Sequence, residues 1–140
     1  MTYINMIVYF LILYPMISII LGNISVYLNI KIPAANFIVL GFLVHSLISA
    51  FVKANRRYLN KKEIQYVFFG FVIIDSLCQT LFGFMAINAQ QIDFSFGALL
   101  KLSAIIVALN ALIIFMFLTS FKENFLKKLS ISNDKKNDPK

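Results

Sequence analysis

The chain has 140 residues, of which 60% are hydrophobic and 14% are charged, and its formal net charge is +7. Soluble domains have about 45–50% apolar residues, and a chain of this length has too few polar side chains to coat so much apolar surface in water. The composition therefore excludes an ordinary soluble domain and predicts an all-α, polytopic membrane protein.

Function classes that depend on charge or on reactive side chains are also disfavoured. The basic residues stand next to apolar runs, where we expect them to meet anionic lipid headgroups, so nucleic acid is not an expected partner. One cysteine and one histidine predict no metal site and no disulfide framework. Because the chain lacks a Gly-rich phosphate loop, a nucleophile elbow and an HExxH pair, we expect no cofactor and no enzyme.

Four long apolar runs follow one another along the chain. They cover about residues 4–28, 33–52, 64–89 and 94–121. A bilayer core about 30 Å thick needs about 20 helical residues, so each run can cross once and none can cross twice. The sequence predicts a four-transmembrane-helix bundle, in which Pro15 kinks the first helix and Pro33 lies in the first turn of the second.

The chain beyond the fourth run divides into two parts. Large apolar side chains recur at every fourth position over residues 121–130, with lysines elsewhere in the segment, which predicts an interfacial amphipathic helix. Residues 131–140 are polar, and we expect a disordered tail there. The transmembrane domain is therefore expected to occupy residues 1–130.

A strongly basic segment, residues 53–63, separates the second run from the third. Its basic residues are Lys53, Arg56, Arg57, Lys61 and Lys62. The next connection has no basic residue, whereas the chain after the fourth run has several. Since cytoplasmic loops are rich in Lys and Arg, we expect this segment and both termini to face the cytoplasm (N-in, C-in). Tyr58 within the segment and Tyr66 just beyond it predict an aromatic belt at headgroup level.

Polar side chains inside the predicted spans are the candidate functional residues, because ionisable groups are costly there. Counting along each helix at about 1.5 Å per residue places one polar side chain per helix at a similar depth, and a glutamine one turn away. This candidate intramembrane polar layer consists of Tyr14, His45, Asp75, Asn110 and Gln79.

Three interpretations of this layer stay open. In the first, its side chains form interhelical hydrogen bonds that each contribute about 0.6 kcal/mol. In the second, Asp75 exchanges a proton with His45 in a proton or ion relay. In the third, these groups pair with the transmembrane segment of a partner.

Lys101 stands about two turns inside the fourth run, nearer the outer face than Asp75 by roughly 10 Å. Its long side chain can extend to the outer headgroups, which is the favoured interpretation, or it can line a pore or contact a partner protein. Ala104 and Ala108 follow on the same helix, at a small-xxx-small spacing that permits close helix packing.

The segment FVKANRRYLNKKE, together with the layout of the spans, resembles a family of small, uncharacterised four-span bacterial inner-membrane proteins. In that family the second span ends in an aromatic residue and Lys, and an Arg-x-Pro turn leads to a Lys/Glu stretch that opens the third helix. Phe51, Lys53, Arg57 and Glu63 fit this pattern, whereas Leu59 stands where Pro is usual. The resemblance implies a bacterial inner membrane and no particular activity.

These features predict a small multi-pass protein of the bacterial inner membrane that acts by protein–protein contact within the bilayer. An immunity or accessory protein that meets a membrane-active toxin is the most concrete form of this hypothesis. The alternative is an oligomeric channel, a holin-like protein or a small proton or ion transporter that uses the layer of Asp75 and His45. A homo-oligomer is compatible with either hypothesis.

Overall fold

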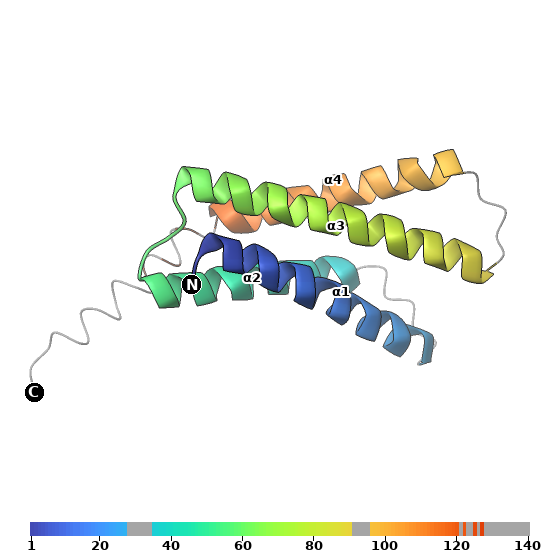
Figure 1. The fold of residues 1–140 in the computed structure, drawn as a ribbon, viewed down its shortest axis with the longest axis horizontal. Helices are drawn as coiled ribbons and strands as arrows, with labels where there is room; N and C mark the ends of the chain where they lie inside the picture. Colours follow the sequence, from blue (N-terminus) through green and yellow to red (C-terminus); the bar gives the residue numbers. More distant parts are fainter. Residues whose placement is uncertain (28–34, 91–95, 121, 123–124, 126, 128–140) are drawn as a thin grey trace, which may run out of the picture.

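The computed structural model describes residues 1–27, 35–90 and 96–120, together with residues 122, 125 and 127. In these residues the regular secondary structure is entirely helical, as predicted. The helices are α1 (Tyr3–Tyr27), α2 (Ala35–Asn55), α3 (Lys61–Gln90) and α4 (Phe96–Ser120) (Figure 1). Each contains a segment long and apolar enough to cross a membrane. Most of the predicted interfacial helix and the whole predicted tail lie outside the described residues.

Local hydrogen bonds cap the start of α1 and the end of α2. The Thr2 side-chain oxygen accepts a hydrogen bond from the backbone N–H of Asn5 at 3.2 Å and so caps α1. At the end of α2, Arg56 adopts a left-handed backbone with φ of 50°, and its N–H bonds to the carbonyl of Val52 at 2.8 Å. This bond and this conformation are those of an αL C-cap, a position that favours glycine.

The start of α3 is held by a capping box, in which two residues bond to each other's backbone. The Asn60 side chain accepts from the N–H of Glu63, and the Glu63 carboxylate accepts from the N–H of Asn60, both at 2.9 Å. Arg57 forms two further bonds to this carboxylate, at 2.7 and 2.8 Å, and its guanidinium lies 5.3 Å from the ring centroid of Phe51. The α2–α3 turn is therefore an ordered structure rather than a flexible link.

The helices run alternately up and down, so that the start of α1 and the α2–α3 turn lie at the same end of the bundle (Figure 1). Both α1 and α4 pack against α2 and α3. The bundle thus consists of two antiparallel hairpins, α1–α2 and α3–α4, with α1 beside α3 and α2 beside α4. At the end with the turn, the Asn55 side chain donates a hydrogen bond to the carbonyl of Met1 at 2.7 Å.

Two glycines lie where neighbouring hairpins approach closely. A Cβ built at Gly70 of α3 would lie 2.9 Å from the Ile7 side chain of α1. A Cβ at Gly41 of α2 would lie 3.0 Å from the Phe117 ring of α4. Both distances are shorter than ordinary van der Waals contact, so the absence of a side chain at these positions lets the two hairpins meet.

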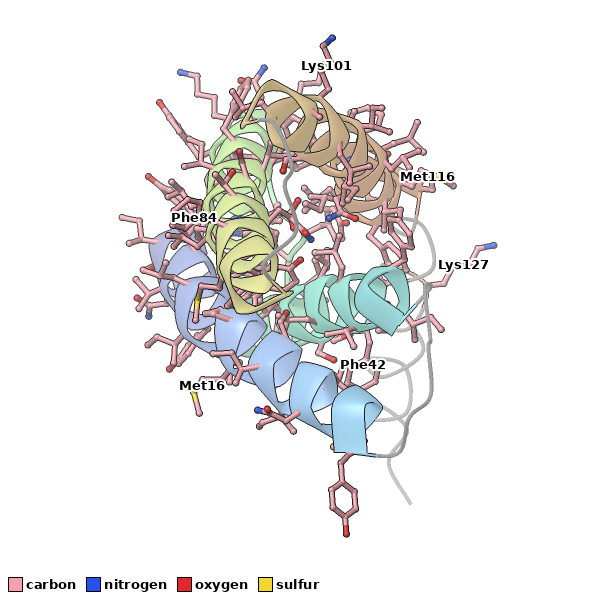
Figure 2. The ribbon with its side chains drawn as sticks, turned by 90° about the vertical axis from the view of Figure 1, so that its right-hand side faces the viewer. Met16, Phe42, Phe84, Lys101, Met116 and Lys127 are labelled. Atoms are coloured by element: carbon pink, nitrogen blue, oxygen red, sulfur yellow. The ribbon has the colours of Figure 1, made fainter. Side chains whose placement is uncertain are left out.

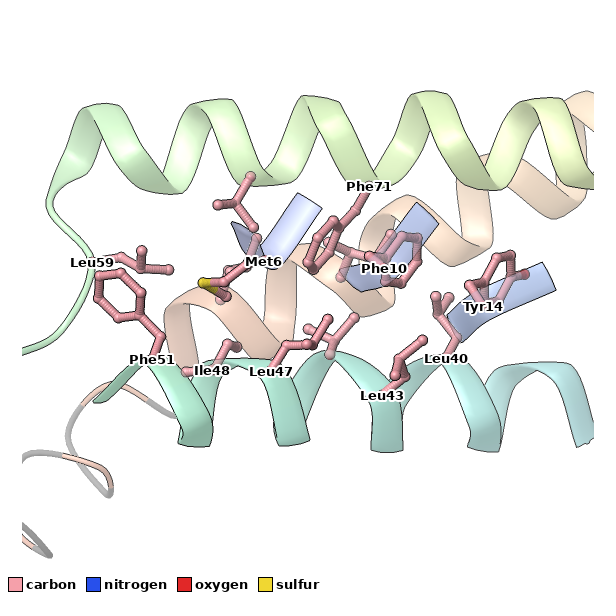
Figure 3. Packing of buried hydrophobic residues seen from close by; sticks show 14 of the residues in the cluster. Met6, Phe10, Tyr14, Leu40, Leu43, Leu47, Ile48, Phe51, Leu59 and Phe71 are labelled. Atoms are coloured by element: carbon pink, nitrogen blue, oxygen red, sulfur yellow. The ribbon is translucent and has the colours of Figure 1, made fainter. Parts of the chain in front are cut away.

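The buried core occupies the half of the bundle nearer the α2–α3 turn. On α1 it includes Met6, Phe10 and Tyr14, which are four residues apart and therefore lie on one face of the helix (Figure 3). Beyond Tyr14 no side chain of α1 that the structure describes is buried, and Ile20 and Ile24 are exposed. Away from the turn, large apolar side chains such as Met16 of α1, Phe84 of α3 and Leu102 of α4 are exposed, and Figure 2 shows Met16 pointing outward.

Expectations for three single residues meet different outcomes. Tyr58 does not belong to a surface belt: it is only 6% exposed, and its hydroxyl donates to the carbonyl of Leu118 at 2.9 Å, because the α2–α3 turn folds against the end of α4. Burial raises the pKa of Tyr58 to about 12. Tyr66 is exposed, as a belt residue would be. Pro15 lies inside α1, whose helix continues through it.

Candidate functional site

The most polar point of the interior is the carboxyl group of Asp75 on α3, which is completely buried. Its Oδ1 accepts a short hydrogen bond, 2.6 Å, from the hydroxyl of Tyr14 on α1. The side-chain nitrogen of Asn110 on α4, which is also completely buried, lies 3.0 Å from Oδ1 and 2.9 Å from Oδ2. One carboxyl group therefore connects three of the four helices.

Gln79 lies one turn beyond Asp75 on the same helix, and its Nε2 donates to the Tyr14 hydroxyl at 3.3 Å. The Tyr14 ring stacks on Phe10 with a centroid distance of 5.0 Å, and Phe10 stacks on Phe71 at 4.1 Å. This stack orients the ring, so the hydroxyl can donate to Asp75 and accept from Gln79 at once. We refer to Tyr14, Asp75, Gln79 and Asn110 as the Asp75 cluster.

The electrostatics of the Asp75 cluster are unusual, since none of the groups bonded to the carboxyl is cationic. The bonds come from a phenol hydroxyl and an amide. The other amide atom, Oδ1 of Asn110, is buried and has no hydrogen-bond partner. A buried carboxylate that lacks a counter-charge is energetically costly, so binding of a proton would stabilise this cluster.

His45 was expected in the same layer, but it is not among the residues bonded to Asp75. Its ring lies 5.1 Å from the ring of Phe125 and 6.2 Å from that of Phe117, and Phe125 in turn lies 6.1 Å from Tyr58 of the turn. His45 thus lies closer to the turn than Asp75 does. Depth counted from helix ends is uncertain by about one turn, about 5.4 Å, and this error exceeds the reach of a hydrogen bond.

Lys101 stands apart from the Asp75 cluster. It is exposed near the start of α4, and its side chain points away from the bundle (Figure 2). Ala104 and Ala108 are exposed as well, so these two small residues do not pack inside the bundle. Positions 101, 104 and 108 lie on one face of the helix by their spacing.

The basic residues of the segment 53–63 have two different roles in the structure. Lys53, Arg56, Lys61 and Lys62 are exposed and leave their charges at the surface. Arg57 instead pairs with Glu63. The capping role of Asn60 and Glu63 was not predicted, although an Asn followed three residues later by Glu ahead of an apolar run is the sequence signature of a capping box.

The described residues contain no group of three His, Cys, Asp or Glu side chains that could hold a metal ion. Cys78 is buried one turn from Asp75 and forms no disulfide.

No protein-family model, curated protein or solved structure matches this chain. Function must therefore follow from the residues themselves.

Proposed function

We propose that the protein is a multi-pass integral protein of the bacterial inner membrane that acts by contact with another membrane protein. Membrane insertion is supported by the large apolar side chains that every helix exposes. Examples, one from each helix, are Leu11, Phe42, Phe69 and Leu112, which are 52%, 72%, 61% and 60% exposed. Exposing so much apolar surface to water is unfavourable, whereas lipid chains cover it without cost.

The proposed orientation is N-in and C-in. It is supported by the exposed cations of the α2–α3 turn, which lies at the same end of the bundle as the start of α1. Reporter fusions after Lys62 and after Lys136 should read cytoplasmic, and a fusion after Gln91 should read periplasmic. A periplasmic signal at Lys62 would overturn the orientation, and neutral replacement of the basic turn residues should weaken it.

Lys101 is the observation that carries the contact function. The Asp75 cluster uses its polar groups for bonds within the chain, so it is not free to pair with a partner helix. Lys101, in contrast, presents a cation on the outward face of an apolar helix. A partner helix that carries a carboxylate at this depth would gain an ion pair in a medium where charges are poorly solvated. An immunity or accessory protein that binds a membrane-active toxin in this way is the form we favour, and no enzymatic activity is proposed.

The test compares Lys101→Leu and Lys101→Gln with Lys122→Gln, which removes an exposed lysine just beyond the end of α4. Each variant is measured for membrane level, for protection against a toxin encoded beside its gene, and for co-purification with that toxin. Loss of protection and of co-purification in both Lys101 variants, at normal membrane level, is expected. If all three variants behave like the wild type, Lys101 is only an anchor at the outer headgroups and the contact hypothesis fails.

A second candidate function is movement of protons or ions, through an oligomeric channel, a holin-like pore or a small transporter. The observation in its favour is the buried Asp75 carboxyl, whose described partners are all neutral. Exchange of a proton directly between Asp75 and His45 is not supported, since no hydrogen bond joins them. Flux measured with the purified protein alone in liposomes separates this candidate from the first, because an accessory protein moves no ions by itself.

A further inference from the structure

The bonding of Asn110 to Asp75 is one-sided. Its Nδ2 lies within hydrogen-bond distance of both carboxyl oxygens, at 3.0 and 2.9 Å, while its Oδ1 is buried without a partner. Both residues are completely buried, so this oxygen does not reach the surface of the bundle. The amide thus faces the carboxyl with its donor end and leaves its acceptor end unused.

The two ends of a primary amide have nearly the same shape, and a half-turn of the group exchanges them. With the nitrogen toward Asp75, the amide stabilises a carboxylate, which can only accept. With the oxygen toward Asp75, the amide accepts a hydrogen bond from a carboxylic acid, which can donate. The turned amide exchanges two nitrogen contacts for one bond from the acid and leaves its NH2 group unpartnered, so the turn is favourable only because it accompanies removal of the buried charge.

We propose that the Asp75 cluster is a proton-binding site in which the Asn110 amide turns to follow the protonation of Asp75. In the ionised state Nδ2 donates to the carboxylate, and in the neutral state Oδ1 accepts the proton that Asp75 has bound. The neutral state removes an anion that has no counter-charge among its partners, which is the usual response of an isolated charge to burial.

The geometry assigns the proton to Oδ2. Oδ1 already accepts the Tyr14 hydroxyl at 2.6 Å, and Gln79 donates to that hydroxyl at 3.3 Å, which directs its hydrogen away from Gln79 and toward Asp75. Oδ2 faces the amide at 2.9 Å, a length within the range of an O–H···O bond. Tyr14 and Gln79 are therefore positioning residues that keep Oδ1 an acceptor in both states.

A proton fits this site better than a metal ion does. Hard cations need several oxygen ligands that point their lone pairs at one centre. Even with the Asn110 amide turned, the Asp75 carboxyl and one amide oxygen would be too few ligands for such an ion, and the Tyr14 hydroxyl directs its hydrogen at Oδ1. A proton needs only one acceptor in line with Oδ2, which the turned amide supplies.

This inference rests on the proposed insertion of the bundle into a membrane and deepens the second candidate function, but it does not depend on any partner. Infrared spectroscopy of the purified protein in phosphatidylcholine vesicles tests it, because a neutral carboxylic acid and a carboxylate have separate stretching bands. Membrane fractionation of every variant shows independently whether the chain inserts, so failure of insertion and failure of proton binding are distinguished.

We expect a carboxylic acid band at neutral pH that shifts when the sample is moved into deuterated water. The band should be absent in Asp75→Asn and retained in Glu63→Gln, which removes the carboxyl group of the turn instead. In Asn110→Leu, which offers no acceptor, the band should move in the direction of a free acid. The shift in deuterated water uses the wild-type chain alone, so the test stands even if Asn110→Leu fails to fold.

Three results would overturn the inference. The first is a spectrum at neutral pH in which wild type and Asp75→Asn differ only by a carboxylate band. The second is a carboxylate band that responds to sodium and not to pH, which would make the site a cation site. The third is a folded Asn110→Leu variant whose acid band is identical to that of the wild type.

Discussion

Replacing Tyr14 by Phe removes one oxygen atom from the centre of the bundle and leaves the ring in place. The stack of the ring on Phe10, at 5.0 Å, needs no hydroxyl, so packing should be preserved. What is lost is the 2.6 Å bond to Asp75 and the weaker 3.3 Å bond from Gln79. The substitution therefore measures the contribution of hydrogen bonding in the Asp75 cluster to the stability of the fold.

The expected loss in the free energy of unfolding is about 1–2 kcal/mol. A net hydrogen bond contributes about 0.5–1.5 kcal/mol, and one to a charged group about 1.5–3 kcal/mol. Measured pairs inside membrane proteins are weaker, about 0.6 kcal/mol on average and at most about 1.7 kcal/mol. Two bonds are lost here, one of them short and completely buried, which places the sum above the membrane average. A loss of this size lowers the folding equilibrium constant roughly five- to thirtyfold.

The measurement is reversible unfolding in mixed detergent micelles, followed by far-ultraviolet circular dichroism. Tyr9→Phe is the matched control, because Tyr9 lies on the same helix and is 49% exposed. Its substitution should change stability by less than about 0.5 kcal/mol. A double-mutant cycle with Asp75→Asn isolates the interaction between the two side chains. Tyr14→Phe should lower the free energy of unfolding by less in the Asp75→Asn background, since the remaining acceptor there is a neutral amide.

Equal stability of Tyr14→Phe and Tyr9→Phe would refute the reasoning. It would mean that the Tyr14 hydroxyl is hydrogen-bonded as favourably in the unfolded state as it is to Asp75 in the native state. The hydrogen bonds of the Asp75 cluster would then not hold the helices together.

Three further outcomes follow from other parts of the fold. Gly70→Ala should be less stable than Gly97→Ala in thermal unfolding, because its Cβ meets Ile7 at 2.9 Å while Gly97 has open space around it. Arg56→Gly should raise stability by up to about 1 kcal/mol, since its φ of 50° strains a side chain. Burial raises the pKa of Tyr58 from 10.0 to about 12. The stability that wild type holds over Tyr58→Phe should therefore be complete below pH 10 and be lost as the pH rises through about 12.

Much of the fold could be predicted from the sequence because it depends on local quantities. The number of apolar runs sets the number of helices, because each run is long enough to cross a bilayer once and too short to cross it twice. The charged residues 53–63 mark the boundary between the second helix and the third. The observed helices agree with the predicted runs to within a few residues at each end. Asp75 could likewise be singled out from the sequence, because a carboxyl group stands out in an apolar run.

What surrounds Asp75 was decided only by the tertiary structure. These helices are apolar on every side, so no amphipathic stripe indicates which face turns inward or which helices are neighbours. Packing set both: α1 lies beside α3 and α2 beside α4. It brought Tyr14 and Asn110 to Asp75 and left His45 against aromatic rings nearer the turn. A shift of one helical turn is enough to separate a bonded polar pair, and depth counted along a sequence does not resolve that shift.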